Sequence, residues 1–149
     1  MSDLRELYQE VILDHHKRPR NFGTLSEANH HAEGRNPLCG DHITIHVDVE
    51  DGRIKAVAFE GAGCAISRAS ASLMTDAVRG KPVAEAEKLF EEFHLLVTTG
   101  VDEEVEASLG KLNVFCGVRE FPSRVKCASL AWHTLHAALG DEPKEASTE

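Results

Sequence analysis

The sequence predicts an α+β fold, in which a small antiparallel sheet packs against several helices. Two observations predict it: apolar residues alternate strictly over one segment, and they recur at helical spacing both before and after that segment. The chain has 149 residues, enough for one domain with a hydrophobic core. We therefore expect a single domain over residues 1–140, followed by a polar tail, 141–149, that is disordered.

The first element is a helix over about residues 3–17. The segment DLRELYQEVILDHHK places Leu4, Tyr8 and Val11 at helical spacing, and Asp3 is suited to cap the N-terminus. Pro19 ends this helix, and a loop follows.

A β-hairpin comes next. Ile43, Ile45 and Val47 face one side of the first strand, while polar residues face the other. The dipeptide Asp51-Gly52 predicts the turn, and IKAVAFE returns as the partner strand. The segment before Asn36 is a weaker candidate for an additional edge strand.

Helices account for most of the remaining chain. After GAGC the apolar spacing is helical until Gly80, and a further helix is expected from near Pro82 to about Thr98. The acidic stretch VDEEVEASLGKL fits either a loop or a single helical turn. The segment PSRVKCASLAWHTLHAALG then predicts a last helix, ended by Gly140.

Charge excludes two classes of partner. The formal net charge is −9, with 25 acidic against 16 basic residues, so nucleic acid and anionic membranes would be repelled. No stretch has the roughly 18 apolar residues that a membrane span needs. The N-terminal segment carries charges where a signal peptide is apolar, and we expect a cytoplasmic protein.

The four cysteines are Cys39, Cys64, Cys116 and Cys127. In a reducing compartment, separated cysteines serve more often as metal ligands or reactive thiols than as disulfides. Cys39 and Asp41 precede the first hairpin strand, and Cys64 follows the second. Because these two strand ends meet at one edge, we expect Cys39, Asp41 and Cys64 to lie close together.

Helix N-termini favour thiolates at two of these positions. Cys64 starts a helix behind two glycines, and Cys127 lies in the first turns of the last helix. The helix dipole and the unpaired N–H groups lower the pKa of a thiol in such a place. Thiolates with a carboxylate suit Zn²⁺ or the iron of a cluster. For Cys127 alone, an ordinary small core residue is an equally good interpretation.

Three motifs then suggest a family. NPLCGD, FEGAGCAISRASASLMTDAVRGK and FPSRVKCASLAW closely resemble the three cysteine motifs of iron–sulfur cluster assembly proteins, the family of IscU, SufU and the N-terminal domain of NifU. ELYQEVILDHHKRPRNFG is similar to the opening segment of that family. The resemblance implies a compact α+β fold and a metal site formed by Cys39, Asp41, Cys64 and Cys127.

Two departures make the chain most similar to SufU. Lys126 stands where IscU proteins typically carry a histidine, and the connection from Cys64 to Cys127 is long, with 62 residues (65–126). The resemblance to SufU implies a Zn²⁺-bound acceptor that takes persulfide sulfur from a SufS-like cysteine desulfurase, and therefore a sulfurtransferase at most. Within it, Cys39 is the expected sulfur acceptor, since its turn is the most mobile of the three cysteine contexts.

Two alternatives remain at this point. One is a scaffold that assembles a [2Fe–2S] cluster on Cys39, Cys64 and Cys127 and passes it to apo-acceptor proteins. The other is a small zinc-stabilised domain that only mediates interactions. Both would use the same residues.

Other residues attract attention without fitting a site. Cys116 lies outside the three motifs and is expected to be incidental. The nine histidines are expected at the solvated surface, and Trp132 and Phe121 in the core. A basic rim for a partner, formed by Arg18, Arg20 and Arg35, is a minor hypothesis.

Overall fold

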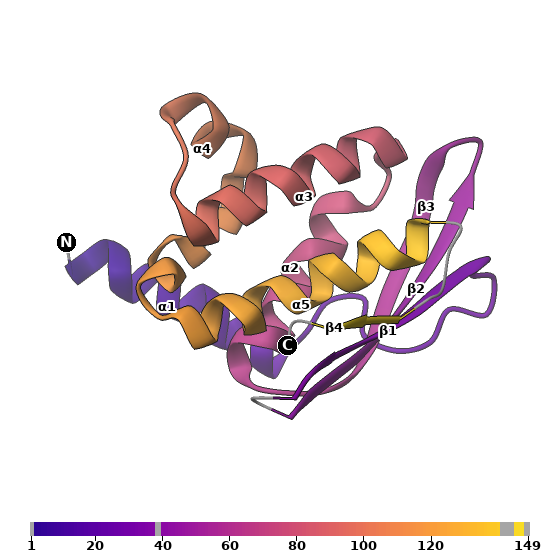
Figure 1. Cartoon of the computed structure of the whole chain (residues 1–149), viewed down its shortest axis with the longest axis horizontal. Coiled ribbons are helices and arrows are strands. Elements are labelled where there is room, and N and C mark those ends of the chain that lie inside the picture. The colour runs from indigo at the N-terminus through magenta and orange to yellow at the C-terminus, as the bar shows by residue number, and fades with distance from the viewer. Residues whose placement is uncertain (1, 38–39, 141–144, 148–149) are drawn as a thin grey trace.

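A computed structural model describes residues 2–37, 40–140 and 145–147 of the chain. The order of elements confirms the α+β class (Figure 1). In chain order they are α1 (Ser2–Lys17), β1 (His30–Asn36), β2 (Asp41–Glu50), β3 (Arg53–Ala62), α2 (Ala65–Val78), α3 (Val83–Thr98), α4 (Glu103–Leu109), the 3₁₀ helix η1 (Gly110–Glu120), α5 (Pro122–Leu139) and β4 (Glu145–Ser147).

The sheet is built around the predicted hairpin and has the strand order β3-β2-β1-β4. β2 pairs antiparallel with β3, and Asp51 and Gly52 turn between them with positive φ angles of 53° and 74°. Both central residues of a type I′ turn need positive φ, which explains the Asp-Gly pair. The proposed edge strand also exists: β1 pairs antiparallel with β2, from His30 opposite Val47 to Asn36 opposite Asp41.

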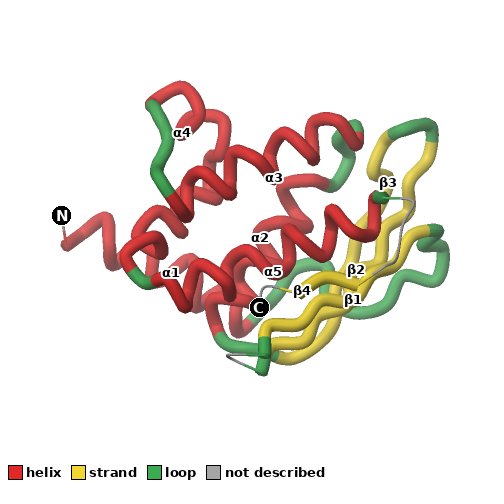
Figure 2. The backbone as a smooth tube through the Cα atoms, in the orientation of Figure 1, coloured by secondary structure: helices red, strands yellow, loops and turns green. Residues whose placement is uncertain are grey.

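One face of the sheet packs against helices, and the core lies between them (Figure 2). On β2 the alternation is as predicted, since Ile43, Ile45 and Val47 are buried. α5 contacts β1 and β2, α2 contacts β3 and α5, and α1 packs on α2. Among the residues that the structure describes, no helix has the length and apolar character to cross a membrane.

The structure differs from the sequence prediction in the acidic segment after α3. Asp102 caps α4 by accepting a 2.9 Å hydrogen bond from the N–H of Val105. η1 follows and buries Leu112 and Phe115. The sequence predicts only a loop or a single turn here, because polar residues outnumber the few apolar ones that are buried. The structure instead contains two helices, α4 and η1.

Three further predictions need correction. Phe121 is 60% exposed although the sequence placed it in the core. His15 is buried, where surface exposure was expected, because its Nδ1 pairs with Ser72 Oγ at 2.6 Å. Of the predicted tail, residues 141–144 and 148–149 lie outside the described residues, and Glu145–Ser147 form β4, parallel to β1, rather than irregular chain.

Candidate metal centre

Three of the four predicted ligands meet at one end of the sheet. Asp41 opens β2, Cys64 caps α2, and Cys127 lies in the second turn of α5. Their ligand atoms all lie within 4.8 Å of one another. The hairpin explains the first two, since His42 is paired with Ala62 and so brings the start of β2 beside the end of β3. Cys39 falls outside the residues that the structure describes.

Asp41 is buried, with 2% of its surface exposed, and is held by two hydrogen bonds. Its Oδ1 accepts from the backbone N–H of Cys64 at 2.8 Å, and its Oδ2 accepts from Asn36 Nδ2 at 3.2 Å. These bonds tie the carboxylate to the end of β1 and to the N-cap of α2. A buried carboxylate beside two thiols is costly unless a cation accompanies it.

Cys64 is placed by the start of α2. Its Sγ accepts a hydrogen bond from the N–H of Ser67 at 3.4 Å, so the sulfur takes the role of an N-cap side chain. Gly63 leaves room for the carboxylate, because a Cβ there would lie 2.6 Å from Asp41 Oδ1.

Cys127 is fully buried, and Asn36 links it to the carboxylate. The Nδ2 of Asn36 is 3.5 Å from Cys127 Sγ as well as 3.2 Å from Asp41 Oδ2. Asn36 Oδ1 is buried and has no hydrogen-bond partner in the described part of the chain. Sequence reasoning missed Asn36; the available signal was its place at the end of β1, directly opposite Asp41.

This donor set fits a zinc or iron ion. Two thiolates bound 2.3 Å from one tetrahedral ion lie about 3.8 Å apart, which agrees with ligand atoms that are within 4.8 Å of one another. Two sulfurs and one carboxylate oxygen form three corners of such a site. Thiolate-rich sets select Zn²⁺ and iron–sulfur clusters over Mg²⁺ or Ca²⁺.

The remaining candidates stay apart from this group. Cys116 lies in η1, packs half-buried against the core, and is not among the clustered ligands. Arg18 and Arg20 both pair with Asp14, at 3.4 Å and 2.7 Å. Arg35 is exposed and lines a shallow depression with Asn36 and Asp41. The basic rim therefore stays a hypothesis, with Arg35 its member nearest the ligands.

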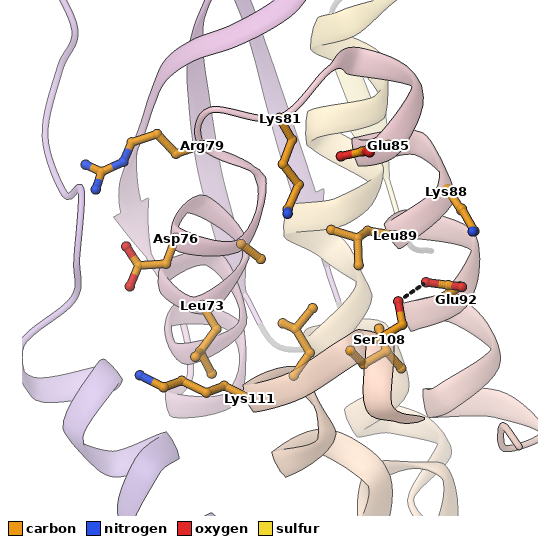
Figure 3. Close-up of a pocket in the computed structure, with 13 residues that line it drawn as sticks. Leu73, Asp76, Arg79, Lys81, Glu85, Lys88, Leu89, Glu92, Ser108 and Lys111 are labelled. Atoms are coloured by element: carbon orange, nitrogen blue, oxygen red, sulfur yellow. Dashed lines mark hydrogen bonds between the residues drawn. The ribbon is translucent and has the colours of Figure 1, made fainter. Parts of the chain in front are cut away.

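A cavity of about 740 Å³ lies elsewhere, between α2, α3 and the α4–η1 segment (Figure 3). Leu73 and Leu89 line its apolar part, and Lys81 extends across it (Figure 3). Glu92 accepts a 3.1 Å hydrogen bond from Ser108 at its edge. Its lining contains none of the predicted ligands, so we do not connect this cavity with the metal centre.

Comparison with known proteins now identifies the family. The description "NifU-like N terminal domain" matches residues 7–147. The chain belongs to this family. The resemblance of the three cysteine motifs is thereby confirmed.

Similar proteins in the family carry two kinds of name. The iron–sulfur cluster assembly scaffold protein IscU of Streptococcus pyogenes serotype M1 is 41% identical over 93% of this chain and 86% of that protein. The zinc-dependent sulfurtransferase SufU of Bacillus subtilis is 37% identical over 95% of both chains. The chain is thus about equally similar in sequence to a protein named as a scaffold and to one named as a sulfurtransferase.

Solved structures agree with the fold. A putative iron–sulfur cluster assembly scaffold protein for the SUF system from Fervidobacterium islandicum superimposes with a TM-score of 0.82 and is 36% identical, covering 88% of this chain and 95% of that one. A hypothetical protein gives a TM-score of 0.83 at 41% identity over 89% of this chain and 96% of that one. The chain therefore shares its α+β fold with both solved structures.

Proposed function

We propose that this protein accepts sulfur in iron–sulfur cluster assembly, with Zn²⁺ bound by Cys39, Asp41, Cys64 and Cys127. The observation that carries the proposal is the convergence of Asp41, Cys64 and Cys127, with ligand atoms within 4.8 Å, in a member of the NifU-like family. The partner that supplies sulfur would be a cysteine desulfurase. The receiving partners would be later components of cluster assembly, and the compartment the cytoplasm.

Cys39 is the proposed acceptor. Its described neighbours Pro37 and Gly40 are both exposed, whereas Cys127 is fully buried and Cys64 half-buried. In the transfer, the Cys39 thiolate attacks the outer sulfur of the persulfide on the partner. The S–S bond of the partner breaks, its cysteine leaves as a thiolate, and the new S–S bond leaves a persulfide on Cys39. No external oxidant or reductant is needed.

The other residues would keep the site assembled. Bound Zn²⁺ supplies a charge that holds cysteines in the thiolate form near neutral pH. Asp41 is fixed by Cys64 and Asn36 through its two oxygens. Cys127 is fixed by its burial in α5. The protein would thus provide one buried sulfur, one half-buried sulfur and a carboxylate next to the chain segment that carries the proposed acceptor.

A second candidate is a scaffold for a [2Fe–2S] cluster on the same residues. Its support is the 41% identity to a protein named as an IscU scaffold. The 37% identity to a protein named as the zinc-dependent sulfurtransferase SufU, over 95% of both chains, supports the first candidate. Lys126, half-buried before Cys127, also favours the first, because an ammonium group cannot ligate metal as a histidine can.

The deciding experiment combines metal analysis with sulfur transfer. Protein purified without oxygen should contain one zinc per chain, lack colour, and accelerate a cysteine desulfurase while gaining one labelled sulfur. Cys39→Ala should abolish that gain, and Cys116→Ala should not change it. Brown protein that holds iron and sulfide and passes a cluster to an apo-acceptor would establish the scaffold instead. Zinc-bound protein without any effect on the desulfurase would indicate a purely structural metal.

A further inference from the structure

Two histidines face each other on the side of the sheet that points away from the helices. His31 on β1 and His46 on β2 are direct cross-strand partners. Their Nδ1 atoms are 2.8 Å apart, and their rings are nearly perpendicular, at 81°. Neither residue takes part in the thiolate site or in the proposed sulfur transfer.

A carboxylate on the third strand orients one of the two rings. His46 Nε2 lies 2.7 Å from Glu60 Oε2 on β3, and the His46 side chain is only 12% exposed. An ionised carboxylate can only accept, so Nε2 of His46 carries the proton. With the ring neutral, Nδ1 of His46 keeps its lone pair, and this lone pair points toward His31.

We propose that His31 and His46 bind a divalent transition-metal ion through their Nδ1 atoms, with Glu60 as the outer carboxylate that orients His46. Imidazole nitrogens are ligands for Fe²⁺, Ni²⁺, Cu²⁺ and Zn²⁺. A metal-binding histidine that donates its other N–H to a carboxylate is the recurring arrangement in protein metal sites. His46 and Glu60 form that arrangement, and His31 provides the second nitrogen.

The spacing of the two nitrogens indicates which geometry the site favours. Two nitrogens 2.8 Å apart, each bound at about 2.0–2.1 Å, subtend an angle of about 85–90° at the metal. A tetrahedral ion would need them about 3.3 Å apart. The metal-free spacing is therefore nearer to the 90° angle of octahedral or square sites, which Ni²⁺, Cu²⁺ and Fe²⁺ adopt with water at the open positions, and the two rings turn so that both lone pairs face the ion.

Metal and proton compete for the same pair of atoms. In the metal-free pair, with both rings neutral, His31 Nδ1–H donates to His46 Nδ1. On metal binding this proton moves to Nε2 of His31, an exposed residue whose other nitrogen can reach solvent. No net proton is released while both rings are neutral, and protonation at acidic pH opposes binding.

The proposed site is separate from the thiolate site. His46 and Asp41 lie on opposite faces of β2, since Asp41 is buried on the helix side and the alternation places residue 46 on the other side. Five residues of strand separate them by about 17 Å. Filling the thiolates with zinc should leave the histidine pair available.

The test is a Ni²⁺ titration of the untagged full chain after one equivalent of Zn²⁺ has been bound. Calorimetry should show a binding event that His31→Gln weakens at least about 10-fold, and that Glu60→Gln weakens by about 10-fold or more. His94→Gln, on the exposed surface of α3, is the matched control and should bind Ni²⁺ as the unaltered chain does.

A second readout locates the ion. Paramagnetic Ni²⁺ should broaden the amide signals of His31, His46 and Ala58, the residue paired with His46 on β3. His31 is exposed, so its replacement is tolerated by the fold, which circular dichroism would verify. Equal Ni²⁺ affinity in His31→Gln and the unaltered chain, or broadening confined to α3 and α5, would overturn the proposal.

Discussion

The backbone N–H of Cys64 donates a 2.8 Å hydrogen bond to Oδ1 of Asp41, which joins the N-cap residue of α2 to the first residue of β2. Two prospective ligands are thereby fixed relative to each other without metal. The Asp41 carboxylate is buried next to two thiols, and its second hydrogen-bond donor is the uncharged amide of Asn36. The metal-free site thus holds a charge that the bound ion would neutralise.

This arrangement predicts effects of opposite sign for Asp41→Asn. In the metal-free protein, the variant removes a buried charge and keeps an oxygen for the N–H of Cys64. Its amide nitrogen replaces Oδ2, and once the Asn36 amide has turned over it can donate to Asn36 Oδ1, which has no partner in the described structure. We expect the free energy of unfolding without metal to rise by about 1 kcal/mol. With zinc, the affinity should fall at least about 10-fold, since an anionic ligand is lost.

Urea unfolding with and without zinc, under reducing conditions, measures both effects. Asp48→Asn is the control, since Asp48 lies on the opposite face of the same strand, and it should leave both quantities unchanged. A fall in stability of equal size with and without zinc would contradict the role given to Asp41.

Gly63 provides the second prediction. A methyl group at this position would lie 2.6 Å from Asp41 Oδ1, so Gly63→Ala should displace the carboxylate. We expect a loss of about 1–3 kcal/mol in the free energy of unfolding and a weaker hold on zinc. Gly117→Ala is the matched control, because nothing lies within 4 Å of its Cβ position.

Chelator competition for zinc and urea unfolding would check the two glycine variants side by side. Equal zinc affinity in Gly63→Ala and Gly117→Ala would show that Asp41 does not need the space that Gly63 leaves.

Much of the site could be predicted, because strand pairing is a local property. The Asp51-Gly52 turn fixes the hairpin, and the hairpin brings Asp41 to Cys64. Cys127 is different: its helix follows the strands by 60 residues (62 to 122), and no local pattern specifies where that helix packs. Cys127 was included in the predicted site only because of the family resemblance. Asn36 was missed because its role depends on a buried contact with Cys127, which only tertiary packing creates.

The exceptions in the fold have a similar cause. Phe121 is apolar, yet it is the residue directly before α5 and is 60% exposed. His15 has a polar side chain, yet it is buried where α1 packs on α2, because Ser72 on α2 forms a hydrogen bond with its ring. Residue type predicts the average burial of a phenylalanine or a histidine, whereas the burial of these two residues depends on their own place in the fold.

His15 leads to a prediction about pH. Burial lowers the pKa of His15 below its usual value, and the nearby Arg20 charge lowers it further. Between this lowered pKa and the unfolded value of about 6.5, the unfolded chain binds more protons than the folded one. Stability from this group is therefore complete above about pH 6.5 and is lost as the pH falls.

We expect the unaltered chain to lose more stability between pH 7.5 and 5.5 than His15→Gln, by at most about 1.4 kcal/mol for each pH unit below 6.5. Urea unfolding at the two pH values provides the comparison. Burial also lowers the pKa of His133 on α5. The variant His133→Gln would therefore measure how much this second histidine contributes to the pH dependence of stability. Identical pH dependence in the unaltered chain and in His15→Gln would contradict the assignment.

The two cysteines on either side of Phe121 should behave differently toward metal. Cys127 Sγ belongs to the clustered ligands, whereas Cys116 packs against the core in η1, outside that cluster. Cys127→Ser removes one ligand of an ion that such sites bind with about 10–16 kcal/mol, and we expect the affinity to fall about 100-fold or more. Cys116→Ser should retain the full affinity. Substitution with Co²⁺ gives the readout, since sulfur-to-cobalt absorption should weaken only in Cys127→Ser. A weaker band in Cys116→Ser would place a thiol at the metal that the structure keeps apart from it.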